Sequence, residues 1–242
     1  MSFSYGFLFW ALIAEIIGTI GGFGSSVFFV PIGNFYFDFY SVLGMTAVFH
    51  LSSNLSKIAL FRKGLDKNML LNIGLPSVVF VIIGAHYSGK IDPKILEVLL
   101  GIFLVGLSLF FLIRKDFSFA PTRDNAVTGG ILSGFSAGLL GTGGAIRGLT
   151  MAAFNMEKSA FIATSAAIDL MIDLTRTVVY YDQGYVHENQ MIYVPFLFAI
   201  GLIGSYIGKR ILNHIPQEKF KKISLLLILL IGLISIVKQF SV

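Results

Sequence analysis

The sequence predicts an all-α polytopic membrane protein made of two inverted repeats, each a re-entrant, glycine-tipped hairpin plus three transmembrane helices. Three observations predict this fold. Hydrophobic residues make up 55% of the 242 residues, and the mean hydropathy is +0.82, which exceeds what a soluble core of this size can bury. Several apolar runs approach the roughly 20 residues of a helical bilayer crossing. The two halves share glycine positions when one is shifted by about 120 residues.

Apolar and polar stretches alternate along the chain and define the expected elements. In order, they are a hairpin over 3–39, spanning helices over 42–61, 69–87 and 95–113, a linker over 114–125, a hairpin over 125–157, and spanning helices over 160–181, 191–207 and 223–237. The stretch "RKDFSFAPTRDN" is assigned as a cytoplasmic linker because it contains a proline and charges. The predicted domains are therefore an N-terminal repeat (1–113), the linker (114–125) and a C-terminal repeat (126–242).

The two hairpins are expected to be re-entrant. Helical arms of about 12 to 17 residues reach about 18 to 26 Å, which is less than the roughly 30 Å hydrocarbon core. The glycine-rich tips are then expected to meet near the middle of the membrane. Two steeply tilted full crossings in each half satisfy the same loop positions, so this alternative stays open.

Matching positions and loop charges predict the orientation of the halves. The pairs that match or nearly match are Gly18 with Gly138, Gly21 with Gly141, Gly24 with Gly144, Thr46 with Thr164, Lys57 with Arg176, and Gly64 with Gly184. Lys and Arg concentrate in cytoplasmic loops. The turn at Gly64 is flanked by Arg62, Lys63 and Lys67, whereas "DQGYVHEN" around Gly184 has neither Lys nor Arg. The second turn is therefore expected outside, which makes the repeats inverted.

The stretch "GLLGTGGAIRG" at residues 138–148 is predicted to form an anion cradle. Glycine permits an irregular turn and a close backbone approach to a ligand. A half-helix that begins there aims free N–H groups and its positive dipole end at the cavity, and the Arg147 guanidinium adds a donor fork for oxyanions. The predicted substrate-binding residues are Gly21, Gly22, Gly24, Ser25, Ser26 and Thr46 in the first half, and Gly141, Thr142, Gly143, Gly144, Arg147 and Thr164 in the second.

Structural explanations of the same residues stay open. Glycines in membrane helices also serve close helix packing. Arg147 also fits a structural bridge to a carboxylate, and Ser25, Ser26 and Thr142 also fit hydrogen bonds to local backbone. The recurrence of the glycine groups in both halves favours binding, because inverted-repeat transporters place their sites at such positions.

Charged residues inside one apolar helix of the second half are predicted to couple transport to protons or ions. Asp169, Asp173 and Arg176 lie at i, i+4 and i+7 on one face. Asp169 is near the middle of its helix, where a charge is costliest. A static bridge between Asp173 and Arg176 is the structural alternative.

A comparable polar stripe lies in the first half. Thr46, His50, Asn54 and Lys57 follow each other at helical spacing, and His50 and Lys57 are the further coupling candidates. The structural alternatives are a hydrogen-bonded His50 and a Lys57 that snorkels to the membrane surface. Glu15 is a carboxylate for which the sequence names no partner.

The glycine motifs give the chain a recognisable family resemblance. The segments "GTIGGFGSSVFFVP", "GLLGTGGAIRG" and "AFIATSAAIDL" in this order resemble the sulfite exporter TauE/SafE family of bacterial membrane permeases. The resemblance implies transport of sulfite, sulfonates or similar sulfur-containing anions across the bacterial inner membrane. Phe23 interrupts the first glycine run, Ala145 ends the second, and the proline usual after it is replaced around Met151. These departures leave the identity of the anion open.

Composition and missing motifs narrow the remaining classes of function. The chain has no cysteine, so thiolate metal sites are excluded, and neither a cofactor nor a metal is expected. The basic residues lie in short loops between apolar runs, which argues against a nucleic-acid partner. The expected partners are a small sulfur-containing anion and membrane lipid, with a homodimer as one option. The leading expectation is a secondary transporter. The alternatives are an anion channel, an accessory scaffold, and an intramembrane hydrolase that uses Ser26 with His50 or His86.

Overall fold

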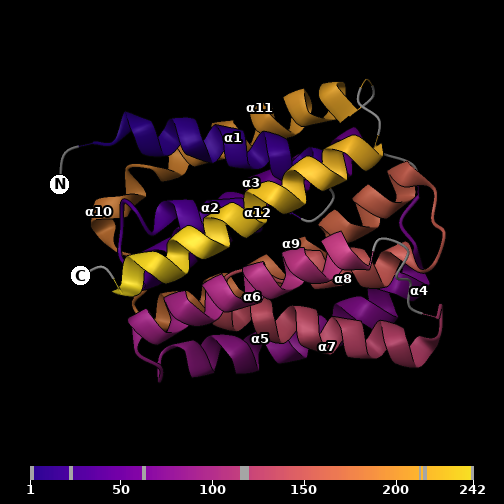
Figure 1. Cartoon of the computed structure of the whole chain (residues 1–242), viewed down its shortest axis with the longest axis horizontal. Coiled ribbons are helices and arrows are strands. Elements are labelled where there is room, and N and C mark those ends of the chain that lie inside the picture. Colours follow the sequence, from indigo (N-terminus) through magenta and orange to yellow (C-terminus); the bar gives the residue numbers. More distant parts are fainter. Residues whose placement is uncertain are drawn as a thin grey trace.

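The computed structural model describes residues 3–21, 24–61, 64–114, 120–212, 214 and 217–240. Every regular element within these residues is a helix (Figure 1). In chain order they are α1 (Tyr5–Gly21), α2 (Ser26–Gly33), α3 (Phe39–Leu60), α4 (Lys67–Met69), η1 (Leu70–Gly74), α5 (Leu75–Ser88), α6 (Pro93–Ile113), α7 (Arg123–Leu140), α8 (Gly144–Ala152), α9 (Lys158–Asp182), α10 (Glu188–Met191), α11 (Val194–Leu212) and α12 (Gln217–Phe240). The prediction of an all-α protein is confirmed.

Polar side chains mark where several helices begin. The residues whose side chains accept a hydrogen bond from a backbone N–H of the first turn are Asp38, Asp66, Asp92, Thr122 and Glu157. Such caps satisfy donors that have no partner within the helix. They therefore fix the starts of α3, α4, α6, α7 and α9 in the order that the sequence pattern predicts.

Three helical segments in the described residues are long and apolar enough to cross a membrane: Lys67–Ser88, Pro93–Ile113 and Val194–Leu212. Helices α3 and α9 have 22 and 25 residues, so at 1.5 Å per residue they reach about 33 and 38 Å. Their mean hydropathy is lower because they carry the polar stripes. Spanning by α3, α9 and α12 stays a prediction.

The helices lie side by side along the longest axis of the molecule, and the most extensive contacts join the two halves of the sequence (Figure 1). The pairs are α5 with α7, α6 with α12, α3 with α9, and α1 with α11. Helix α3 also contacts α11, and α9 also contacts α5. The helices α1, α3, α5 and α6 of the first half can be matched in order to α7, α9, α11 and α12 of the second. The contact of α5 with α7 then corresponds to that of α11 with α1, and the contact of α3 with α11 corresponds to that of α9 with α5. The contacts of α3 with α9 and of α6 with α12 correspond to themselves. This symmetry is the pattern expected of two repeats, although their inversion across a membrane stays a prediction.

Glycines on α7 bring its backbone against α5. Gly130, Gly134 and Gly138 are four residues apart, and a Cβ at any of them would collide with backbone of the segment from Ile73 to Ala85. Small residues at this spacing allow close helix packing in membranes. The first glycine of the predicted cradle, Gly138, therefore has a packing role.

Helices α1 and α2, and likewise α7 and α8, lie within the two segments predicted to be hairpins, and the turns between the helices of the two pairs touch each other. The second arms, α2 and α8, have 8 and 9 residues and reach only about 12 and 14 Å. Gly24 and Gly141 have positive φ values of 82° and 75°, which glycine adopts without strain. The Ser26 hydroxyl donates to Thr142 Oγ1 at 3.2 Å. The re-entrant position of these tips in a membrane stays a prediction.

Candidate functional site

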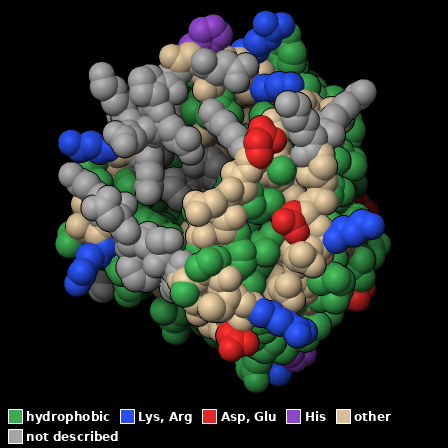
Figure 2. All heavy atoms as spheres, turned by 90° about the vertical axis from the view of Figure 1, so that its right-hand side faces the viewer, with side chains coloured by type: hydrophobic (Ala, Val, Ile, Leu, Met, Phe, Trp, Pro, Cys, Tyr) green, Lys and Arg blue, Asp and Glu red, His purple; other side chains and the backbone are tan. Residues whose placement is uncertain are grey.

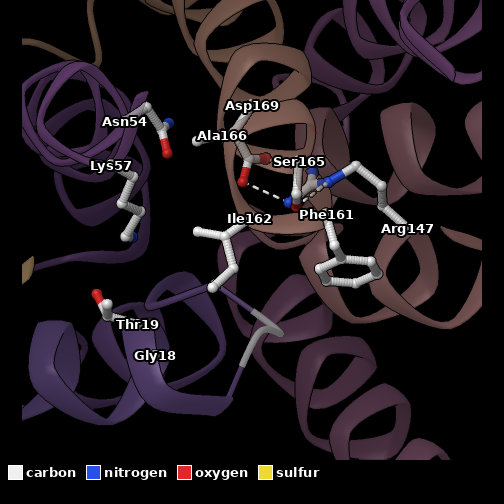
Figure 3. A pocket seen from close by; sticks show the side chains of 11 residues that line it. Gly18, Thr19, Asn54, Lys57, Arg147, Phe161, Ile162, Ser165, Ala166 and Asp169 are labelled. Carbon is white, nitrogen blue, oxygen red and sulfur yellow. Dashed lines mark hydrogen bonds and ion pairs between the residues drawn. The ribbon is translucent and has the colours of Figure 1, made fainter. Parts of the chain in front are cut away.

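A small cavity lies where α1, α3, α8 and α9 meet, next to the tip of the first hairpin (Figure 3). Its lining residues are Gly18, Thr19, Gly24, Asn54, Lys57, Arg147, Phe161, Ile162, Ser165, Ala166 and Asp169. The cavity volume is about 30 Å³, which corresponds to about two water-sized spheres. A larger ligand therefore requires side chains to move.

Arg147 of α8 and Asp169 of α9 form a two-pronged ion pair in this cavity (Figure 3). The Arg147 Nε atom also donates to Ser165 Oγ at 3.0 Å. The side chain of Arg147 is 1% exposed, whereas that of Asp169 is 21% exposed. The Arg147 guanidinium is therefore held in place by the surrounding protein, and the Asp169 carboxylate is the partner that a ligand anion can replace.

A second cation, Lys57 of α3, lies across the cavity from Arg147 (Figure 3). Its ammonium is 2.9 Å from Glu15 Oε1 and donates to Ser53 Oγ at 2.8 Å. Glu15 is fully buried and accepts further hydrogen bonds from Thr19, Ser25, Ser53 and Ser205. Lys57 therefore has a named partner and does not snorkel, and Glu15 is a site residue that the sequence left without a role.

Asp173 and Arg176 form the predicted bridge, deeper in the bundle than Asp169. Arg176 Nε and Nη2 lie 2.8 and 2.7 Å from Asp173 Oδ1, and Asn54 Nδ2 donates to Asp173 Oδ2 at 2.7 Å. The imidazole of His50 lies between this pair and the first hairpin. Its Nε2 atom is 2.9 Å from Ser25 Oγ, and its Nδ1 atom is 3.9 Å from Asp173 Oδ2.

Arg176 also holds the tip of the second hairpin. Its Nη1 atom donates to the carbonyls of Gly141 at 2.9 Å and Ala137 at 3.3 Å, and the Tyr180 hydroxyl donates to Gly138 O at 2.6 Å. These carbonyls are at the C-terminal end of α7, which carries partial negative charge. Arg176 is thus a structural cation as well as the partner of Asp173.

A larger cavity of about 430 Å³ lies at the opposite end of α3 and α9. It is lined by Tyr40, His86, Gly89, Lys90, Gln183, Gly184, Tyr185 and His187. The Tyr185 ring, which is part of this lining, stacks on Tyr40 at 4.5 Å and on Tyr180 at 5.2 Å, and Tyr180 in turn contacts the tip of the second hairpin through Gly138. Burial raises the pKa of the Tyr185 hydroxyl, although its hydrogen bond to Ser88 opposes this.

The structure brings together only part of the predicted site. Gly24, Lys57, Arg147 and Asp169 line the cavity. The predicted residues with contacts elsewhere are Ser25 (to Glu15 and His50), Ser26 and Thr142 (to each other), Thr46 (to Val42 O), Thr164 (to Asp66 N), Gly141 (against Leu43), Gly143 (against Ser133 O), and Gly144 (beside Gly24). Gly22 lies outside the described residues, and Gly21 ends α1. The ligand roles of these residues stay predictions.

Sequence reasoning missed Gly18, Thr19, Ser165 and the apolar lining of α9. The spacing of Ile162, Ser165, Ala166 and Asp169 is a signal that was present, because positions three and four apart share a helix face. Gly18 allows a close approach, since a Cβ there would lie within 2.7 Å of Ser25 Cβ.

The serine and histidine within hydrogen-bond distance of each other are Ser25 and His50, not Ser26 and His50. Ser25 is 1% exposed, lies outside the cavity lining and donates its proton to Glu15. A hydrolase needs a nucleophile that a substrate can reach. The geometry of Ser25 therefore does not favour hydrolysis.

Apolar helices of spanning length and a cavity bordered by paired charges define a membrane transport protein as the class. Comparisons with known proteins agree with this assignment. The family described as "Sulfite exporter TauE/SafE" matches residues 7–234, and the chain belongs to this family. It is also 26% identical over 238 residues to a probable membrane transporter protein of Methanocaldococcus jannaschii, with 86% of each chain covered. The family expected from the glycine motifs is confirmed.

Proposed function

We propose that the protein is a secondary transporter that exports sulfite or a related small sulfur-containing oxyanion or organosulfonate across the cell membrane. The observation that carries the proposal is the Arg147 guanidinium, which is fixed in a cavity between the two halves by Ser165 and held by an exchangeable carboxylate. Membership of the family and the transporter relative support the class of function.

The Asp169 carboxylate stands where the transported anion binds. Arg147 offers it two parallel N–H groups, the arrangement that suits any group with two oxygens on one atom, including sulfite and sulfonate. The cavity is too small for both anions, and two negative charges side by side repel each other strongly away from water. The anion and Asp169 therefore compete for Arg147.

This competition couples the anion to a proton. An anion displaces Asp169 most readily when the carboxylate is protonated, because the neutral acid no longer holds the guanidinium. Anion and proton then move in the same direction, and a singly charged anion carries no net charge across the membrane. Export follows an outward gradient of the anion, and acid on the inner side accelerates it.

Alternating access uses the two ends of the bundle. The cavity near Arg147 lies toward the end where α3 finishes and α9 begins, and the loop charges predict that this end is on the cytoplasmic side. Figure 2 shows charged side chains among hydrophobic ones on the end of the bundle that carries α4 and α8. We infer that the stacked rings of Tyr40, Tyr185 and Tyr180 close the path to the outer side.

Counterflow in liposomes tests the proposal. Purified protein is reconstituted with unlabelled sulfite inside, and uptake of labelled sulfite is measured, with thiosulfate and sulfoacetate as competitors and sulfate as the control anion. The proposal expects exchange that does not respond to an imposed membrane potential. A flux that follows the potential without saturating would identify an anion channel, and the absence of any exchange would contradict the transporter.

A further inference from the structure

Four buried groups form a chain that anion binding at Arg147 does not use. Glu15 of α1, Ser25 of the first tip, His50 of α3 and Asp173 of α9 follow one another and are each at most 6% exposed. The Ser25 Oγ atom lies 2.6 Å from Glu15 Oε2 and 2.9 Å from His50 Nε2. We propose that Ser25 and His50 are a proton path that joins Glu15 in the first half of the chain to Asp173 in the second.

Ser25 has the geometry of a relay. Its hydroxyl carries one proton and two lone pairs, so it donates to one neighbour while it accepts from the other. Glu15 does not depend on Ser25 for neutralisation, because Lys57 is 2.9 Å away and other hydroxyls complete its hydrogen bonds. The bond to Ser25 is therefore the one that leads out of the Glu15 cluster.

His50 continues the path to the second half. Its Nδ1 atom is 3.9 Å from Asp173 Oδ2, so a shift of about 1 Å makes a hydrogen bond. Asn54 donates to the same oxygen at 2.7 Å and keeps it turned toward α3. The path thus crosses the contact between α3 and α9, where the two halves meet.

The surroundings of His50 favour an imidazole that passes a proton on and does not retain it. The charged groups that act on the ring are Lys57 on its own helix, Arg147 on α8, and Asp173 and Arg176 on α9. The imidazole is buried, so a lasting positive charge on it would lack solvation, and the three cations among these groups add repulsion. A proton that arrives at the ring therefore leaves toward a carboxylate.

The transfer is balanced in protons. Protonated Glu15 gives its proton to Ser25 Oγ as the hydroxyl proton of Ser25 passes to His50 Nε2. The proton on Nδ1 then moves to Asp173. One O–H bond is lost at Glu15 and one is gained at Asp173, while His50 changes tautomer and is reset when the ring turns or a proton returns.

The path deepens the proposed transport function and rests on it. Lys57 lines the cavity and neutralises Glu15, so an anion that attracts Lys57 leaves Glu15 without its counter-ion. A proton that returns from Asp173 through His50 and Ser25, by the reverse of the steps above, then neutralises Glu15. Occupation of the cavity in this way changes the protonation of groups on both sides of the contact between the halves.

Net efflux and counterflow in liposomes test the path, because only net efflux requires the proton to be delivered and removed. We expect Ser25→Ala and His50→Gln to slow net sulfite efflux and the accompanying pH change of a trapped dye by about a hundredfold, and to slow counterflow far less. Ser108→Ala is the matched control, since Ser108 is equally buried and its hydroxyl has no hydrogen-bond partner among the described residues. Equal slowing of both fluxes by Ser25→Ala would overturn the path.

A second measurement does not need the substrate. The chain has four histidines, so replacing His86, His187 and His214 with Gln leaves His50 as the single imidazole signal in ¹⁵N NMR. The charge-neutral double change Glu15→Gln with Lys57→Met should alter the tautomer balance of His50, and adding Ser25→Ala should remove this dependence. An unchanged His50 signal overturns the path. If wild type shows no sulfite counterflow, the transport proposal fails while the NMR result still decides the path.

Discussion

Arg147 and Asp169 face each other with both oxygens of the carboxylate on the guanidinium fork, and of these two side chains that line the cavity the aspartate is the more exposed. The pair joins α8, the short arm of the second hairpin, to the long helix α9. A substrate anion that takes the place of Asp169 therefore breaks a contact between two elements. Binding and movement of the hairpin are linked through these two side chains.

Removing the competing carboxylate should strengthen anion binding. In Asp169→Asn the side chain keeps its shape but no longer neutralises Arg147, so sulfite affinity should rise by about tenfold, equivalent to 1.4 kcal/mol. Calorimetry at pH 6 and pH 8 checks this. The same variant should lose the acceleration by acid on the inner side. Affinity equal to that of wild type would mean that Asp169 does not compete with the anion.

Removing the guanidinium should weaken binding. Arg147→Gln alone leaves Asp169 unpaired, so it is compared with the double variant Arg147→Gln/Asp169→Asn, in which no charge is left unmatched. Both should bind sulfite at least about tenfold more weakly than Asp169→Asn. Arg147→Lys keeps the charge without the two-pronged donor geometry, so its affinity for sulfite should lie between that of Asp169→Asn and that of Arg147→Gln. If the double variant binds as tightly as Asp169→Asn, the anion sits elsewhere.

The Lys57–Glu15 pair should behave as a buried ion pair in thermal unfolding. Lys57→Met alone leaves a fully buried carboxylate without its cation, which should cost about 3 to 5 kcal/mol. The double change Lys57→Met/Glu15→Gln should recover most of that loss. Unfolding in detergent, followed by circular dichroism, measures both. Additive losses in the double variant would show that the two side chains act independently.

Glycine packing between α5 and α7 should be sensitive to a single methyl group. A Cβ at Gly134 collides with the backbone of Ser77, whereas nothing lies within 4 Å of a Cβ at Gly106 on α6. Gly134→Ala should therefore lower stability by about 1 to 3 kcal/mol, and Gly106→Ala should raise it slightly through helix propensity. The melting temperatures of the two variants decide this, and equal values would argue against close packing at Gly134.

Cysteine labelling tests the inverted orientation of the repeats. Because the chain has no native cysteine, each introduced cysteine is unique. Glu188 and Thr122 are exposed and lie on the two opposite predicted sides of the membrane. Glu188→Cys should react with an impermeant maleimide from outside intact cells, and Thr122→Cys only after the cells are opened. The reverse pattern would overturn the assignment of sides.

The sequence predicts which faces of single helices are polar better than it predicts which faces meet. The i, i+4, i+7 spacing placed Asp169, Asp173 and Arg176 on one face and suggested the bridge between the last two, which the structure confirms. The partners of Asp169 and Glu15 come from other helices, Arg147 on α8 and Lys57 on α3. Such pairs depend on how the helices cross, which local spacing does not determine.

Glycine was the residue type most difficult to interpret from sequence. Gly24 lines the cavity, whereas Gly138 and Gly143 press against backbone of α5 and α7. All three occur in similar glycine-rich surroundings, because a ligand and a neighbouring helix impose the same requirement, the absence of a side chain. Only the tertiary neighbours separate the two roles.

The interleaving of the two halves has a consequence for synthesis on the ribosome. Helix α1 packs on α11, so at 5 to 20 residues per second the partner of the first helix emerges about 9 to 35 s after α1 itself. During that interval Glu15 lacks Ser205, although Lys57 is made early enough to neutralise it. The newly made first half must therefore stay in the membrane as an unfinished unit, and its native packing is completed only when the last helices arrive.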